Sequence, residues 1–255
     1  MRKPDNWIIS LKEQEKSKRL LFSFPYAGGN SAIFHSWKRL FPLELTVVPI
    51  EFPGKGRRFK ENPYTTLEDA VKELRNWFLK ELYSDFVLFG HSLGALIAFE
   101  LARSLEESGV SPKLLVVSGC NAPSFKPAGN ERQTFNNLSD QELIGALKRL
   151  NGTPAEILEN KDLMKVLLPV IRSDFCLLDH YTFSFSSFGK RLDCPLLILG
   201  GMDDGEVPID GLNEWGSYTE REFKVKLFEG DHFFLHKSGH LIATEIMLYL
   251  SELDK

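Results

Sequence analysis

Several features are scarce in this 255-residue chain, and each scarcity excludes a class of protein. No apolar run approaches the roughly 18 residues of a membrane-spanning helix, so we expect no membrane association. The three cysteines, Cys120, Cys176 and Cys194, are too widely spaced for a disulfide framework or a zinc site, which favours a reducing cytoplasm. A net charge of only −4 gives no basic footprint for nucleic acid.

Short apolar runs that alternate with helical patterns are the main organising feature. The runs lie at residues 20–25, 45–50, 86–89, 114–117, 196–199 and 223–228. Apolar residues at three- and four-residue steps predict helices at 66–83, 93–105 and 241–253. Strands that alternate with helices predict an α/β fold with a mostly parallel, doubly wound sheet. We expect residues 1–255 to form a single domain.

One interval departs from this alternation. About 75 residues separate the fourth and fifth apolar runs, far more than an ordinary connection contains. Helical spacing recurs within it at 138–150 and 161–181, and Ser139 with Glu142 forms a capping-box pattern. The sequence therefore predicts a helical insertion at about 121–193 that covers the end of the sheet as a lid.

The segment Gly90-His91-Ser92-Leu93-Gly94 follows the third apolar run directly and begins a helical pattern. A nucleophile elbow requires this arrangement, because the strand-to-helix turn is so tight that neighbouring Cβ atoms would clash. The G-x-S-x-G pattern alone is weak and also fits a simple tight turn. Its place between a strand and a helix makes Ser92 the predicted nucleophile.

A serine hydroxyl needs a base to remove its proton. In the chain order of α/β hydrolases an acid and then a histidine follow the serine. His232 follows the last apolar run, and Asp203 and Asp204 follow the fifth, so all three can reach the same sheet edge. Spacing alone does not separate Asp203 from Asp204.

The histidines at 232, 236 and 240 also have the spacing of metal ligands on a helix. Phe233, however, stands where the metalloprotease motif has its glutamate, and no second cluster completes a site. We therefore expect no metal centre.

Acyl transfer needs hydrogen-bond donors for the oxyanion of the tetrahedral intermediate. The backbone N–H of Leu93, directly after the nucleophile, is one expected donor. The other is expected from the glycine-containing loop after the first apolar run, through the N–H of Ala27. The alternative for that loop is a plain Gly-Gly turn.

A basic cluster formed by Lys55, Arg57 and Arg58 follows the second apolar run. The carboxyl edge of such a sheet binds ligands, so these charges could attract an acidic partner or a phosphate. The alternative is a solvated loop, which is the usual environment of a charge run.

With these residues in hand, the chain resembles the type II (external) thioesterases that accompany nonribosomal peptide and polyketide synthases. The resemblance extends over about residues 20–250, and the lid motifs are its most specific part, since general hydrolases lack them. The matching motifs lie at 24–29, 53–57, 90–94, 152–156, 168–169, 172–175 and 201–204.

The resemblance implies an α/β-hydrolase with the triad Ser92, Asp204 and His232, the second aspartate of the G-x-D-D motif being the triad acid. Asp231 stands where the family usually has glycine, so Asp203 and Asp231 remain alternatives that could share the role of Asp204.

The function that the resemblance implies is hydrolysis of acyl or aminoacyl thioesters from the phosphopantetheine arms of acyl or peptidyl carrier domains. That chemistry needs no metal and no diffusible cofactor. Tyr26, Lys55, Arg57 and Arg58 are the residues expected to contact substrate or partner. A generic carboxylesterase or lipase, and a non-catalytic α/β-hydrolase scaffold, are the alternative interpretations.

Overall fold

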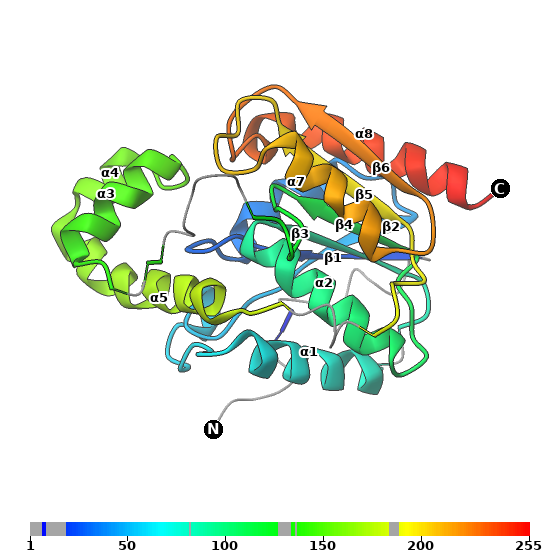
Figure 1. Ribbon diagram of the computed structural model, residues 1–255. Helices are drawn as coiled ribbons and strands as arrows, with labels where there is room; N and C mark the ends of the chain where they lie inside the picture. The colour runs from blue at the N-terminus through cyan, green and yellow to red at the C-terminus, as the bar shows by residue number, and fades with distance from the viewer. Residues whose placement is uncertain (1–6, 9–18, 82, 127–133, 136, 184–188) are drawn as a thin grey trace.

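The computed structural model describes residues 7–8, 19–81, 83–126, 134–135, 137–183 and 189–255 (Figure 1). Parts of the predicted insertion, at 127–133, 136 and 184–188, lie outside the described residues, as does residue 82 of the first predicted helix. No described helix combines the length and the apolar composition that a bilayer span requires.

A parallel sheet with the strand order β2-β1-β3-β4-β5-β6 forms the centre of the molecule. Each predicted apolar run is a strand, so the α/β fold with a parallel sheet is confirmed. The strands are β1 (Arg19–Phe24), β2 (Leu45–Pro49), β3 (Phe86–His91), β4 (Leu114–Ser118), β5 (Leu196–Gly201) and β6 (Phe223–Phe228).

Helices cover both faces of the sheet, which explains why the central strands are apolar throughout. In β3, Phe86 and Leu88 belong to one core, whereas Val87 and Phe89 belong to the core on the other face. The first face is covered by α1 (Leu67–Glu81) and α2 (Leu93–Glu106), and the second by α8 (Leu235–Leu253) (Figure 1). The shorter helical segments are α7 (Ile209–Asn213) and the 3₁₀ turns Ser31–Phe34, Ser36–Arg39, Gly56–Arg58 and Glu214–Tyr218.

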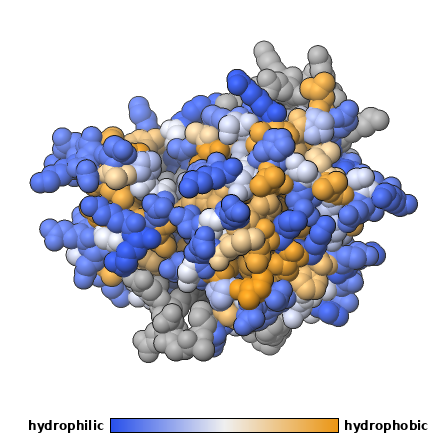
Figure 2. Space-filling model, turned by 90° about the horizontal axis from the view of Figure 1, so that it is seen from above, coloured by the Kyte–Doolittle hydropathy of each residue, from blue (hydrophilic) through white to orange (hydrophobic). Residues whose placement is uncertain are grey.

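Helix α8 begins at Leu235, six residues before the start that the spacing predicted. Its first turns contain His236, Ser238 and Gly239, which have modest or poor helix propensity. Burial of Leu235 and Phe234 offsets that deficit through packing. The outer surface of α8 exposes Leu241 and Leu248, and Figure 2 shows apolar patches among hydrophilic side chains on this upper face.

The strand register brings the carboxyl ends of the strands to one edge. Phe24 of β1 pairs with Gly90 of β3, and His91 pairs with Ser118 of β4. The loops that leave β1, β3, β5 and β6 therefore begin at the same edge of the sheet, and the candidate site forms among them.

The insertion contains α3 (Asp140–Leu150), α4 (Ala155–Glu159) and α5 (Lys161–His180), which stand to one side of the sheet in Figure 1. The capping box is present: Ser139 accepts from the backbone of Glu142, whose side chain accepts from the backbone of Ser139. The two helical stretches predicted here are confirmed, whereas α4 was not predicted. A separate apolar cluster, including Leu143, Leu168 and Phe175, packs these helices together.

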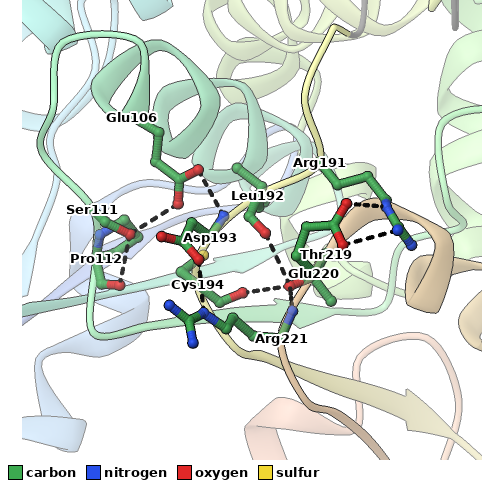
Figure 3. A network of polar contacts seen from close by, with 10 residues as sticks. All are labelled: Glu106, Ser111, Pro112, Arg191, Leu192, Asp193, Cys194, Thr219, Glu220 and Arg221. Carbon is green, nitrogen blue, oxygen red and sulfur yellow. Dashed lines mark hydrogen bonds and ion pairs between the residues drawn. The ribbon is translucent and has the colours of Figure 1, made fainter.

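The chain returns from the insertion through a network of polar contacts (Figure 3). The backbone N–H of Asp193 donates to the carboxylate of Glu106 at the end of α2. The carboxylate of Asp193 pairs with Arg221 at 2.7 Å. The Thr219 hydroxyl donates to the carbonyl of Cys194 at 2.7 Å. These bonds fix the return segment to the framework at the amino end of β5.

The entry to the insertion is held by the same part of the framework. Trp215 Nε1 donates to the carbonyl of Cys120 at 2.8 Å, and the backbone N–H of Ser124 donates to the Tyr218 hydroxyl at 2.9 Å. Residues 214–221 thus anchor both the entry and the exit.

Candidate active site

Ser92 occupies the turn between β3 and α2 with φ 54° and ψ −119°, a conformation that non-glycine residues rarely adopt. The turn is tight enough to require glycine on both sides. A Cβ on Gly90 would lie 2.1 Å from the Gly94 carbonyl oxygen, and one on Gly94 would lie 2.2 Å from the Phe24 carbonyl oxygen. The strand–turn–helix context predicted for Ser92 is therefore present.

The strain at Ser92 can be measured by comparing two variants that both lack the hydroxyl. Ser92→Gly relieves the positive φ, whereas Ser92→Ala keeps the Cβ and the strain. We expect the glycine variant to have the higher free energy of unfolding, by roughly 1 kcal/mol after the entropy that glycine adds to the unfolded chain. Urea denaturation measures the difference. Equal stability, or a more stable alanine variant, would show that the turn stores no strain.

His232 and Asp204 form a hydrogen-bonded pair at the same edge of the sheet. His232 Nδ1 lies 2.8 Å from Asp204 Oδ2, and the Asp204 side chain has no exposed surface. The other carboxylate oxygen, Oδ1, accepts from the backbone N–H groups of Glu206 and Val207. A carboxylate held in this way binds the Nδ1–H tautomer, which leaves His232 Nε2 as the basic nitrogen.

Asp203 and Asp231, the alternative partners for His232, are oriented elsewhere. Asp203 is exposed. Asp231 accepts from Asn151 of the insertion at 3.0 Å and from the backbone N–H of Phe233 at 2.9 Å. The bond from Asn151 is the main cause that lowers the pKa of Asp231. Of these three described carboxylates, Asp204 is the one hydrogen-bonded to His232.

His91 connects the elbow to the segment of residues 229–234 between β6 and α8, called the histidine loop below. Its ring centroid lies 5.1 Å from that of His232, and its Nδ1 lies 2.9 Å from the Ser118 hydroxyl. Complete burial, followed by the neighbouring histidines, lowers the pKa of His91 well below its usual value, so the ring is neutral. Ser92 and His232 thus share one edge of the sheet, although no hydrogen bond joins them in the described structure.

The turn of residues 26–29, called the oxyanion loop below, lies directly beside the elbow. The missing Cβ of Gly94 allows its close approach to the Pro25 carbonyl at the start of the loop. In the oxyanion loop, the N–H of Gly29 donates to Tyr26 and that of Gly28 donates to Asp174 of α5. Among the described residues, neither Ala27 N–H nor Leu93 N–H has a protein acceptor, so both can donate to a ligand.

The residues expected to contact substrate or partner are placed differently from one another. Tyr26 is largely buried, its hydroxyl lies 3.0 Å from His236 Nε2, and burial raises its pKa to about 12. Arg57 is exposed and donates to the carbonyl of Ile8.

The structure corrects the exposure that the sequence analysis assumed for Lys55 and Arg58, because docking on exposed charges and a solvated loop both need accessible side chains. The two residues are 6% and 3% exposed. Lys55 pairs with Asp174, and Arg58 pairs with Glu61 while its guanidinium lies 4.8 Å from the centre of the Trp7 ring. Internal contacts explain these two charges.

Functional residues that the sequence analysis missed come from the insertion. Asn151 and Asp174 contact the histidine loop and the oxyanion loop, respectively. Gly152 packs on the ring of Phe233, where an added Cβ would lie 2.1 Å from the ring.

Within the described ranges, no cluster of three histidine, cysteine or acidic side chains could hold a metal ion.

A parallel sheet with a serine elbow and a histidine–carboxylate pair at its carboxyl edge defines an α/β hydrolase. The chain belongs to the thioesterase domain family, whose sequence profile matches residues 19–247.

Relatives named for biosynthetic pathways agree with this assignment. The chain is 37% identical to the gramicidin S biosynthesis protein GrsT of Aneurinibacillus migulanus, over 92% of this chain and 90% of that protein. Its structure is similar to that of the type II thioesterase BorB from the borrelidin biosynthetic cluster, with a TM-score of 0.84, 30% identity and coverage of 98% and 100%.

A further relative is named linear gramicidin dehydrogenase LgrE, from Brevibacillus parabrevis, at 36% identity over 97% of this chain and 95% of that protein. That name describes the relative, and the sequence of the present chain contains no G-x-G-x-x-G, the dinucleotide-binding fingerprint.

Proposed function

We propose that this protein is a serine thioesterase that releases acyl or aminoacyl groups from the phosphopantetheine arms of synthase carrier domains. The observation that carries the proposal is the His232–Asp204 pair at 2.8 Å on the edge where Ser92 is presented. The membership in the thioesterase domain family and the likeness to ClbQ from the colibactin NRPS/PKS pathway support the substrate class.

In the proposed acylation step, Ser92 Oγ attacks the thioester carbonyl while His232 Nε2 takes the serine proton. Asp204 holds the imidazole tautomer and stabilises the charged ring. The N–H groups of Ala27 and Leu93 donate to the oxyanion. When the C–S bond breaks, His232 returns the proton to the departing thiolate, which leaves as the free thiol of the phosphopantetheine arm.

In the proposed deacylation step, a water molecule replaces the thiol. His232 removes a proton from water, and the resulting hydroxide attacks the acyl-serine carbonyl. The proton then returns to Ser92 Oγ as the carboxylic acid leaves. The net reaction is hydrolysis of one thioester to one acid and one thiol, which would regenerate a carrier blocked by a wrong acyl group.

The test supplies the purified protein with acyl-loaded carrier protein and follows loss of the acyl group by mass spectrometry. An oxygen ester of the same acyl group serves as the matched substrate. We expect faster release from the thioester and fluorophosphonate labelling at Ser92. Preference for the oxygen ester would instead indicate a carboxylesterase, and failure to label Ser92 would indicate a non-catalytic scaffold.

A further inference from the structure

Asp174 is a carboxylate on lid helix α5 that contacts the oxyanion loop instead of solvent. It is 6% exposed, and one of its oxygens, Oδ2, accepts two hydrogen bonds. The donors are the backbone N–H of Gly28 at 2.6 Å and Nζ of Lys55 at 2.5 Å. Two segments that are distant in the sequence therefore meet on a single oxygen atom of the lid.

The bond to Gly28 restrains the flexible part of the oxyanion loop. Gly28 has φ 80°, and glycine has wide freedom around such a position. The N–H of Gly29 donates to the Tyr26 carbonyl and closes the turn. The bond to Asp174 fixes the peptide group between Ala27 and Gly28. The direction of Ala27 N–H, a loop donor without a protein acceptor, depends on both restraints.

Helix α5 also packs directly on the loop. A Cβ added to Gly28 would lie 3.4 Å from Ile171 Cγ1, an ordinary contact distance. Ile171 and Asp174 are three positions apart and so lie on the same face of the helix. The same face of α5 therefore supplies both an apolar contact and a hydrogen bond to the oxyanion loop.

Lys55 holds the Asp174 carboxylate in place. Both side chains are buried, and a buried charge requires a partner because it has lost its hydration. Removing one member of such a pair leaves the other uncompensated, whereas removing both charges avoids that penalty. This asymmetry allows the bond to Gly28 to be tested apart from the ion pair.

We propose that Asp174 is a positioning residue that, through Gly28, aims the Ala27 N–H at the developing oxyanion, while Lys55 fixes Asp174. This inference rests on the proposed function and deepens it. Docking of α5 and completion of the oxyanion site then become one event, because movement of the helix breaks both bonds of Asp174.

The test compares two double variants, Lys55→Met with Asp174→Asn and Lys55→Met with Asp174→Leu. Both lack the buried ion pair and have similar volumes, but only asparagine keeps an acceptor oxygen for Gly28. On a small acyl thioester we expect kcat to stay within about threefold of wild type for the asparagine variant and to fall about 10²-fold for the leucine variant. KM should change by less than about threefold in both.

A boronic acid that adds to the nucleophilic serine supplies a readout that a merely structural role would not change. Its oxygen occupies the oxyanion site, so its Ki should rise in the leucine variant by the factor that kcat falls. Asp162→Asn, on the exposed surface of α5, is the control and should change neither value. Equal kcat values in the two double variants, or a constant Ki with a reduced kcat, would overturn the proposal.

Hydrogen exchange of the wild-type protein tests the same idea without a variant. The Gly28 amide proton should exchange no faster than the buried part of α5, because the helix must move before the bond opens. Much faster exchange at Gly28 would overturn the proposal. Wild-type hydrolysis of acyl-carrier thioester tests the proposed function separately, so a negative result at Asp174 alone leaves that function standing.

Discussion

Replacing Ser92 by alanine is expected to lower kcat for acyl release from a loaded carrier by at least about 10³-fold. The variant lacks the hydroxyl oxygen that forms the acyl-enzyme. His232 therefore has no hydroxyl proton to accept at this position. The residual rate would come from substrate positioning and from the N–H donors of Ala27 and Leu93. Single-turnover assays with the loaded carrier measure the change.

The control for this variant is Ser217→Ala, an exposed serine distant in sequence from the elbow. It should retain wild-type kcat. Ser92→Ala should also keep the affinity for the acyl-carrier, because the loss concerns chemistry and not binding. Hydrolysis by Ser92→Ala at the wild-type rate would refute the mechanism.

Replacing Asp204 by asparagine is expected to lower kcat by roughly 10³- to 10⁴-fold, because it reverses the histidine tautomer. The N–H groups of Glu206 and Val207 already require an acceptor at Oδ1, so the amide oxygen of asparagine must occupy that place. Its NH₂ group then faces His232 Nδ1, which must accept. The proton moves to Nε2, and that nitrogen can no longer take the serine proton.

The matched control for Asp204→Asn is the same change at the adjacent exposed residue, Asp203→Asn, with an expected loss below about twofold. Asp231→Asn should also have a small effect, because Asp231 makes no hydrogen bond to His232 and the asparagine oxygen can still accept one of its two bonds, from Asn151 or from Phe233 N–H. Rates with the loaded carrier distinguish these outcomes. A large loss at Asp203 or Asp231 with a small one at Asp204 would reassign the carboxylate.

The sheet and the elbow were predictable because their signals are local. A short apolar run predicts β3, and the two glycines beside Ser92 predict the tight turn. Close packing of the backbone at that turn requires glycine at both positions. The capping box at Ser139 is equally local. Such patterns specify a strand, a turn or a helix start without reference to the rest of the chain.

The choice between Asp203 and Asp204 was not predictable from spacing, because the two are neighbours in one loop. The backbone decides between them: Asp203 N–H donates to Gly230 O, while the Asp204 side chain receives two N–H groups of its own turn. That turn directs Asp204 toward His232. Only the folded loop contains this information.

The environment of Lys55 was unpredictable for a different reason. Its partner, Asp174, lies 119 positions away in the sequence, on a helix of the insertion. Charge patterning measures neighbours along the chain and so describes Lys55 as part of an exposed basic cluster. Long-range neutralisation is a property of the tertiary structure.

The shared anchor at residues 214–221 holds both ends of the insertion at one place in the framework. Because Trp215 and Tyr218 hold its entry and Thr219 and Arg221 hold its exit, the two junctions keep their spacing whatever helices lie between them. A segment exchanged between these junctions would still have to present a carboxylate where Asp174 lies, because the insertion also bonds to Gly28 and Lys55. Changes of length or sequence in the insertion are therefore constrained at that contact and not at its two junctions.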